Sequence, residues 1–578
     1  MSRSHYVAHE LHNGHLTFAS EDIDHQENWP RNLFVWRSNL IGTNAKGHEY
    51  FLKHLLGAEN AVLGEDGSGR ASQEIQWHEK APVGKLDLMI DINFRLNSTG
   101  AYADIILPTA TWYEKDDLNT TDMHPFIHPL GAAVDPGWES RSDWQIFRHL
   151  AKSFSTLAEK HLGKRKDLLA ISLLHDTPNE LGQAVGVSDW KREGKIPEPG
   201  RTCPNFEIVE RDYPHIYEQY SSIGPLLATH GNGAKGEHWE TGQEISELLA
   251  INGTFPSSRK GKEDARPSLE SDINACNMVL HLSPETNGEV AHKGWLSLST
   301  KTGLSLTKLA NDRRGEKFSF HDLQVQPRKV ISSPSWSGLM SEEVSYNAGY
   351  VNVHYATPYR TLTGRGQFYL DHEWMLDFGE GLCTYRPPLT THAVAGLPEA
   401  IAQQGGIVLR FLTPHDKWGI HSTYHDDLRM MHLSRGGPHI WLSEKDADQL
   451  KISDNDWLEA VNENGALMAR AVVSQRIPEG VAIMYHQQEK TLNVPGAPST
   501  GKRGGINNSA TRVIVKPTHM IGGYAQLAWT LNYYGPVGSQ RDAEVLIRKV
   551  NDAQISWMEK QLGPDLETEL RQAVEESQ

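Results

Sequence analysis

The densest run of residues that could bind a ligand lies between residues 103 and 129. An apolar stretch ends at Pro108, and acidic, amide and histidine side chains follow it, among them Glu114, Asn119 and His124. The apolar stretch predicts a buried strand, and in an open α/β sheet ligands bind beyond the carboxyl ends of the strands. The segment therefore predicts a polar binding site at the edge of a sheet.

The polar side chains of this segment have more than one interpretation. Its carboxylates could form a cation cage, but such crowding is more typical of a solvated turn or a helix cap, so Asn119 and Thr120 are the better candidates for contacts to a ligand or a neighbouring domain. His124 and His128 have the spacing of metal ligands on a helix, but a proline follows each of them and argues against a helix. No metal ligand is predicted here.

A second candidate site follows the short apolar run that ends at Trp36. Arg37, Ser38 and Asn39 come directly after this expected strand, and Lys46 precedes the expected helix. A strand end, hydrogen-bond donors and a helix N-terminus together favour a phosphate. An ordinary strand-to-helix turn is the alternative. No Gly-x-Gly-x-x-Gly motif is present, which disfavours a nicotinamide dinucleotide.

The next expected strand, residues 86–92, ends in the same way. Asp91, Asn93 and Arg95 lie at its carboxyl end. A carboxylate at this place can accept hydrogen bonds from ribose hydroxyls or from the edge of a guanine base. The two strand ends together predict a nucleotide site.

A third cluster is rich in histidine and lies within residues 413–425. His415 and His421 follow an expected strand, and His486 follows another. An imidazole can donate or accept a hydrogen bond and changes its charge near neutral pH, which is useful beside a redox-active ring. One histidine among the 29 of the chain is weak evidence, but His415 and His421 gain from their proximity in sequence.

Arginines next to glycine form a further set of candidates. Arg365, Arg435 and Arg503 each adjoin a glycine, an arrangement that lets a guanidinium and main-chain N–H groups share a phosphate. Asn507 and Thr511 lie just beyond Arg503 and are further candidates for cofactor contacts.

The elements that must position these residues follow two patterns of secondary structure. Strands and helices alternate at first, which predicts a doubly wound parallel sheet. A helix is expected from Ser142, with an apolar face of Trp144, Phe147, Leu150, Phe154 and Leu157, and a strand at 278–282 is expected before a helix at 287–298. From Gly406 onward short strands separated by Asn-Glu-Asn-Gly and Pro-Glu-Gly turns predict a mostly β barrel.

Four regions are expected from these changes of style. They are a polar lead segment at 1–28, a Rossmann-like dinucleotide-binding domain at 29–270, a second α/β and ligand-wrapping region at 271–404, and a C-terminal β-barrel domain at 405–578.

Composition excludes several classes of protein. A net charge of −17 disfavours a general nucleic-acid or anionic-membrane surface, which needs clustered Lys and Arg. The three cysteines lie far apart in sequence, so no zinc or iron–sulfur ligand cluster is predicted. No apolar run reaches the length of about 20 residues that a membrane helix needs. Residues 1–28 lack a secretory or twin-arginine signal.

The segment at 103–129 resembles the signature of the molybdopterin oxidoreductases, the dimethyl sulfoxide reductase family, in the form seen in respiratory nitrate reductase alpha subunits. The resemblance runs through nearly the whole chain and implies its C-terminal portion. It implies a double-psi type of barrel, and molybdenum bound by two molybdopterin guanine dinucleotides. His415, His421 and His486 resemble residues that contact the pterins, whereas Asn507 stands where close relatives carry histidine.

The resemblance also implies what this portion lacks. The [4Fe-4S] cluster and the carboxylate that ligates molybdenum would lie in the missing N-terminal half, so the chain alone is expected to be inactive. An iron–sulfur beta subunit and a membrane cytochrome b-type gamma subunit would be its partners, at the cytoplasmic face of the membrane. Two alternatives remain: a related molybdoenzyme with another substrate, or an inactive cofactor-binding fragment of a split gene.

Overall fold

The computed structural model describes residues 1–17, 25–40, 51–57, 84–121, 124–171, 205–234, 237–256, 265–332, 401–424, 427–433, 438–486, 506–511 and 543–550, together with single residues at 48 and 199 and scattered positions from 368 to 400. The chain forms two compact units, each assembled from separate stretches of sequence. One unit comprises Met1–Phe18, Pro108–Leu382 and Thr518–Gly535, and is called unit 1 here. The other, unit 2, comprises Ala19–Leu107, Cys383–Pro517 and Pro536–Gln578.

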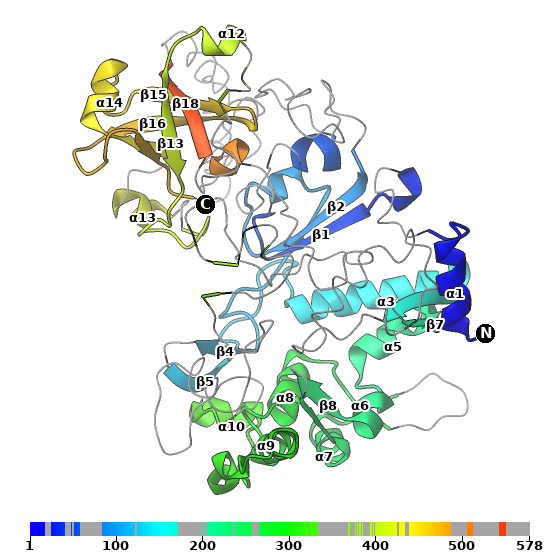
Figure 1. The fold of residues 1–578 in the computed structure, drawn as a ribbon. Coiled ribbons are helices and arrows are strands. Elements are labelled where there is room, and N and C mark those ends of the chain that lie inside the picture. Colours follow the sequence, from blue (N-terminus) through cyan, green and yellow to red (C-terminus); the bar gives the residue numbers. More distant parts are fainter. Residues whose placement is uncertain are drawn as a thin grey trace. The chain divides into compact units, whose positions relative to one another are not determined.

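Unit 2 contains the sheet that the first strands were expected to form. The strands β1 (Arg31–Trp36), β2 (Leu86–Asn93) and β3 (Ile105–Pro108) lie in the order β1-β2-β3, and β1 and β2 are parallel (Figure 1). A π-helical turn at Phe51–Leu55 covers this sheet, because Leu52 packs against Val35 and Met89. The expected mixture of α and β structure is confirmed.

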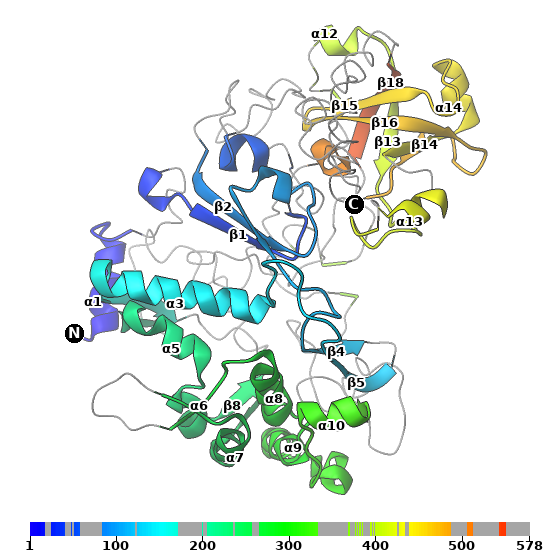
Figure 2. The same cartoon turned by 180° about the vertical axis from the view of Figure 1, so that it is seen from behind.

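Unit 2 also contains a closed six-stranded barrel with the strand order β13-β17-β14-β16-β15-β18. Phe411, Leu442 and Leu467 lie in its fully buried core. The expected strands after Gly406 are confirmed, and Asn462 pairs with Gly465 across the predicted Asn-Glu-Asn-Gly turn. Figure 2 shows the barrel from behind, with the short helices α12 (Glu399–Ala402), α13 (Leu428–Leu433) and α14 (Glu444–Gln449). The barrel strands are β13 (Ile407–Leu412), β14 (His439–Leu442), β15 (Trp457–Asn462), β16 (Gly465–Val473), β17 (Val481–Ile483) and β18 (Ala543–Lys549).

Unit 1 contains the helix expected from Ser142, which is α3 (Asp143–His161). The Ser142 side chain accepts a hydrogen bond from the Gln145 N–H, so Ser142 is the N-cap. The expected apolar face is only partly correct, because Phe154 is 40% and Leu157 57% exposed. The buried residues of the helix are instead Asp143, Ile146, Ala151, Ser155 and Ala158.

The strand expected at 278–282 is wrong. These residues form the end of helix α8 (Asp272–Leu282), which Ser271 caps by accepting a hydrogen bond from the Asn274 N–H. A short apolar run cannot by itself distinguish a strand from a buried helix. Here Cys276 and Leu280, one helical turn apart, both enter the core around Trp295. The helix expected next is confirmed as α9 (Gly288–Thr302).

The remaining elements of unit 1 are mostly helices and short antiparallel pairs. The lead segment, expected only to be polar, contains a helix whose buried side chains include Val7 and Leu11. Of the helices that the structure describes, none is long and apolar enough to cross a membrane. These elements are α1 (Arg3–His12), β4 (Asp117–Thr121), β5 (His124–Leu130), β6 (Lys164–Ile171), β7 (Asn205–Asp212), α5 (Ile216–Ser221), α6 (Pro225–His230), β8 (Asn232–Ala234), β9 (Glu237–Trp239), α7 (Gly242–Asn252), β10 (Thr254–Phe255), β11 (Arg266–Pro267), α10 (Phe320–Val325) and β12 (Arg328–Lys329).

Candidate functional site

The ends of β1 and β2 meet at one edge of the unit 2 sheet. The two strands are parallel, and the ladder continues past β1 because the Arg37 N–H donates to the Ile92 carbonyl at 2.9 Å. Arg37 has φ 48°, in the left-handed region that residues other than glycine seldom adopt, and its guanidinium lies 5.4 Å from the centre of the Phe94 ring. Such backbone conformations cluster at ligand sites.

Amide side chains give this edge a defined shape. Asn39 Oδ1 accepts hydrogen bonds from the Thr99 N–H at 3.1 Å and from the Thr99 hydroxyl at 2.7 Å. Asn97 Oδ1 accepts from the N–H groups of Thr99 and Gly100, both at 2.9 Å. Asn39 thus holds the turn after β2 in place. Asn97 and Thr99 were not predicted, because only the tertiary pairing of two strand ends brings them to Asn39.

Asp91 is the most unusual group at this edge. Its side chain is fully buried in β2, and among the residues that the structure describes neither carboxylate oxygen has a hydrogen-bond partner. Burial raises the pKa of Asp91 from its ordinary value of 3.8 to about 6, although the nearby Asn93 side chain and the Arg95 charge act in the opposite direction. A buried acceptor without a partner costs about 1–3 kcal/mol. Asp91 therefore destabilises the fold unless a further group donates hydrogen bonds to its carboxylate.

Gly100 allows the chain to pass close to this carboxylate. A Cβ atom at Gly100 would lie 2.8 Å from Asp91 Oδ2, too close for an ordinary contact. Gly100 is held by the Asn97 side chain, so it cannot easily move away. The close approach packs the turn after β2 tightly against the Asp91 carboxylate.

Three histidines converge at the end of the barrel. One ring nitrogen from each of His415, His421 and His486 lies within 4.8 Å of one from each of the other two. The ring centres are separated by 4.0 Å for His415 and His486, 5.5 Å for His415 and His421, and 5.7 Å for His421 and His486. We call these three residues the histidine triad.

The barrel topology explains how the triad assembles. The strands β13 and β17 are neighbours and run parallel, so their carboxyl ends lie together. The ladder extends beyond both strands, because the His486 N–H donates to the Pro414 carbonyl at 3.0 Å. This bond places His486 beside His415, which follows Pro414. Two histidines that are about 70 residues apart in sequence thus become neighbours, which no sequence spacing could indicate.

His421 joins the triad through a tight turn. Ile420 and Thr423 exchange both backbone hydrogen bonds, which leaves His421 and Ser422 at the tip, and His421 has φ 54°. The Arg95 guanidinium donates to the Ser422 carbonyl at 3.1 Å and to its hydroxyl at 3.0 Å. Arg95 therefore links the sheet edge to the turn that presents His421, and both lie in unit 2.

The remaining predicted residues lie in several places. Ser38 is half-buried and Asn93 buried at the sheet edge, whereas Asn507 and Thr511 are buried at the ends of a short 3₁₀ turn that contacts the barrel. Asn119 is exposed on β4 in unit 1. Lys46, Arg365, Arg435 and Arg503 lie outside the described residues.

The acidic side chains near Asn119 accept hydrogen bonds from nearby backbone N–H groups. Glu114 Oε2 accepts from the Thr111 N–H at 2.8 Å, and Asp116 Oδ1 accepts from the Ala132 N–H at 3.1 Å. These bonds fit the predicted turn better than a cation cage. His124 and His128 lie on a strand, as their prolines indicated, with ring centres 4.9 Å apart.

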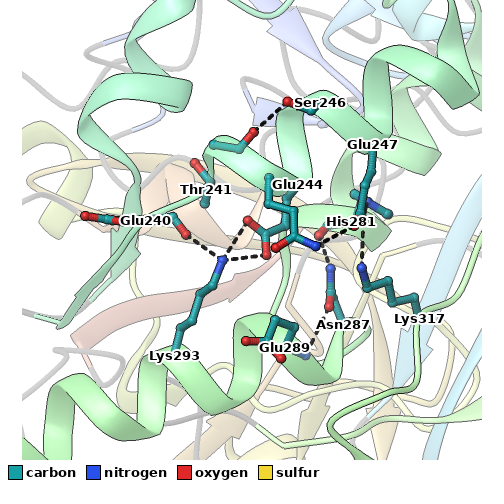
Figure 3. A network of polar contacts seen from close by, with 12 residues as sticks. Glu240, Thr241, Glu244, Ser246, Glu247, His281, Asn287, Glu289, Lys293 and Lys317 are labelled. Atoms are coloured by element: carbon teal, nitrogen blue, oxygen red, sulfur yellow. Dashed lines mark hydrogen bonds and ion pairs between the residues drawn. The ribbon is translucent and has the colours of Figure 1, made fainter.

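Unit 1 has a polar network of its own, which no sequence pattern indicated (Figure 3). Lys293 Nζ donates to both oxygens of the fully buried Glu244, at 2.7 and 2.9 Å. Glu247 accepts from Lys317 Nζ at 2.6 Å and is 2.9 Å from His281 Nε2. Burial alone would raise the pKa of Glu247, but hydrogen bonds, led by that from Lys317, lower it to about 2. In this network the carboxylates have their partners within the protein.

Three family models match the chain. The molybdopterin oxidoreductase model matches residues 8–153, the model of domain V of the nitrate reductase alpha chain matches residues 230–354, and the molybdopterin dinucleotide-binding domain matches residues 409–528. The first model spans the sheet edge, and the third includes the histidine triad. The chain belongs to the molybdopterin oxidoreductases, and its homologues include the nitrate reductase alpha chains.

The relatives include respiratory enzymes from several bacteria. The chain is 53% identical to the respiratory nitrate reductase 2 alpha chain of Escherichia coli K12, over 97% of this chain and 45% of that protein. It is 47% identical to the nitrate reductase alpha chain of Bacillus subtilis 168, over 96% of this chain and 45% of the relative. It is 27% identical to the perchlorate reductase alpha subunit of Dechloromonas aromatica, over 90% of this chain and 39% of the relative. The chain thus spans less than half the length of these relatives.

Proposed function

We propose that this chain is the C-terminal portion of the catalytic subunit of a molybdenum-dependent nitrate reductase, which reduces nitrate to nitrite in anaerobic respiration. Identity of 53% to a nitrate reductase alpha chain, against 27% to a perchlorate reductase subunit, favours nitrate as the substrate. Its cofactor is molybdenum held by two molybdopterin guanine dinucleotides. The metal and its pterins supply the two-electron chemistry when they are bound.

The observation that carries this proposal is the buried carboxylate of Asp91. A guanine edge offers two N–H donors side by side, and a carboxylate with two unsatisfied oxygens is their natural acceptor. Arg37 stands at the neighbouring strand end, where a guanidinium suits a phosphate. The sheet edge therefore fits the nucleotide end of one dinucleotide.

The histidine triad fits the pterin part of the cofactor. Its rings can donate to or accept from ring nitrogens of a pterin, and Arg95 fixes the turn that presents His421. We assign Asn507 and Thr511 a supporting place in the same binding surface. In this proposal the sheet is part of a doubly wound domain and the barrel is of the double-psi type.

The rest of the enzyme completes the proposal. The [4Fe-4S] cluster and the carboxylate ligand of molybdenum lie in the part of the relatives that this chain does not match, so the chain alone does not reduce nitrate. An iron–sulfur beta subunit and a cytochrome b-type gamma subunit deliver electrons, and the complex lies at the cytoplasmic face of the membrane. The widely spaced cysteines of this chain support a cluster held elsewhere.

The test is reconstitution with an N-terminal half taken from a full-length relative. The chain alone should give no nitrite with an artificial electron donor, and the reconstituted enzyme should turn over. In that enzyme Arg37→Ala should lower molybdenum and guanine content, because a charge-assisted contact to phosphate is worth about 1.5–3 kcal/mol.

The matched control is Arg31→Ala. Arg31 begins the same strand at the opposite end, has φ 59°, and pairs with Asp87 on the surface. Both variants place alanine in a left-handed conformation, so only the location differs. Equal molybdenum and guanine contents in the two variants would contradict the assignment of Arg37.

A further inference from the structure

The histidine triad has the composition of a transition-metal site. Three imidazoles meet with one nitrogen each within 4.8 Å, and no other such group of metal-ligating side chains occurs among the residues that the structure describes. Neutral imidazole is a ligand for zinc, cobalt, nickel and copper ions. A metal held by three histidines keeps a fourth position for water, as in many zinc sites.

The surroundings of the triad order the ligands. His486 Nδ1 lies 2.9 Å from the Pro414 carbonyl oxygen and donates to it, which leaves Nε2 as the basic nitrogen of that ring. A carbonyl partner of this kind is typical of metal-binding histidines, because it fixes the tautomer and the ring orientation. The parallel ladder beyond β13 and β17 holds the His415 and His486 backbones side by side. The Arg95 contact to Ser422 holds the backbone turn that carries His421 in place.

Only small movements separate this arrangement from a bound geometry. Zinc–nitrogen bonds of about 2.0–2.1 Å in a tetrahedron place the nitrogens about 3.3 Å apart, closer than the limit of 4.8 Å observed here. His415 and His421 are exposed, so rotation of their side chains meets little resistance. The nearby Lys417 ammonium lies 4.6 Å from the centre of the Trp418 ring, where a cation–π contact holds it.

We propose that, in the cofactor-free chain, His415, His421 and His486 bind one divalent transition-metal ion of the zinc class. This ion takes no part in the molybdenum chemistry. One consequence rests on the proposed function: because the same rings would contact a pterin, the metal ion and the dinucleotide exclude each other. A cell must then keep the site free of metal, or displace the ion, when the cofactor is inserted.

Cobalt(II) is the probe that tests this site in the purified 578-residue chain. Titration should give one tight equivalent with the strong visible absorption of a four-coordinate ion, and zinc should displace it. Alanine at any triad position should weaken cobalt binding by more than about 100-fold, because the loss of a ligand costs more than the roughly 10–100-fold that the loss of a ligand's supporting contact costs. Circular dichroism should show that the variants remain folded.

The chain carries many other histidines, so a matched control is essential. His124→Ala and His128→Ala remove a second pair of adjacent rings, on β5, and should leave the tight equivalent unchanged. Loss of the tight equivalent in the β5 variants but not in the triad variants would overturn the proposal. Absence of any single tight equivalent in the unmodified chain would overturn it as well.

Variants at two different places, His415 and Arg37, separate this inference from the proposed function. A glutamine side chain can still hydrogen-bond a pterin but is a poor ligand for zinc-class ions. His415→Gln should therefore lose cobalt binding in the cofactor-free chain. Unchanged cobalt affinity in His415→Gln would contradict the metal site alone. Unchanged cofactor content in Arg37→Ala would contradict the cofactor assignment alone.

Discussion

The sheet edge of unit 2 and the charge network of unit 1 treat buried carboxylates in opposite ways. Glu244 is fully buried and receives two hydrogen bonds from Lys293, whereas Asp91 is fully buried and has no hydrogen-bond partner among the described residues. A paired carboxylate contributes to the stability of its domain. An unpaired one costs stability until a ligand supplies the missing donors. A cluster of charge therefore does not by itself indicate a site, and a buried carboxylate with neither oxygen satisfied is the better candidate.

The largest effect should come from breaking the network of unit 1. Lys293→Met leaves the fully buried Glu244 without its cation and should destabilise the chain by about 3–5 kcal/mol. The double variant Lys293→Met with Glu244→Leu should recover most of this loss, because no charge remains buried. Thermal or urea unfolding measures both. If the single variant unfolds like the unmodified chain, the network is not structural.

At the sheet edge, by contrast, removing a charge should increase the stability of the chain. Asp91→Asn should stabilise the cofactor-free chain near pH 7, by up to about 3 kcal/mol, since each pKa unit is worth about 1.4 kcal/mol and the pKa of Asp91 rises from 3.8 to about 6. The penalty is absent below pH 3.8, grows as the pH rises, and is complete above pH 6. The difference in melting temperature between the two proteins should therefore shrink on acidification. A destabilised Asn variant at pH 7 would contradict this account of Asp91.

The same substitution should harm the reconstituted enzyme. Asparagine keeps only one acceptor oxygen, so Asp91→Asn should lower the guanine content after purification by about tenfold. This loss follows from one charge-assisted hydrogen bond of about 1.5–3 kcal/mol. A variant that is more stable without cofactor yet binds it less well would show that the native carboxylate is retained for binding.

A smaller effect is expected where the sheet edge meets the triad. Arg95→Met removes the two hydrogen bonds to Ser422 and should weaken cobalt binding by about tenfold, less than the loss of a histidine ligand. Arg95→Lys should restore part of the affinity, since one ammonium can reach only some of the acceptors. Equal cobalt affinities for the Met variant and the unmodified chain would leave Arg95 without a positioning role.

The smallest effect is expected on the free energy of unfolding at acidic pH. The pKa of Glu247 is lowered from 4.5 to about 2, so its contribution is complete above pH 4.5 and is lost as the pH falls towards 2. Glu247→Gln should cost about 1 kcal/mol at pH 7 and nothing near pH 2, because the pair is partly exposed. Glu210→Gln, at an exposed pair with Lys164, is the control and should change little at either pH.

Much of the local structure was determined by the sequence itself. Apolar runs bounded by polar residues indicated β1 and β2, a serine followed by an amphipathic stretch indicated α3, and Asn-Glu-Asn-Gly indicated the turn between β15 and β16. The positions of Arg37, Asp91 and His415 at strand ends followed from the same patterns. These features depend on neighbours along the chain, so a local pattern is enough to predict them.

Tertiary structure decided the rest. The end of α8, at 278–282, was mistaken for a strand because so short an apolar run does not reveal the helical period, although Val279 is exposed and Leu280 buried. The contacts of Asn39 with Thr99, of Arg95 with Ser422 and of His415 with His486 depend on which strands lie side by side. Whether a buried carboxylate has a partner is likewise a property of packing, because a side chain's neighbours in space are not its neighbours in sequence. For this reason the sequence shows only that Glu244 and Asp91 are both acidic. The fold makes Glu244 part of a structural ion pair and Asp91 a candidate binding residue.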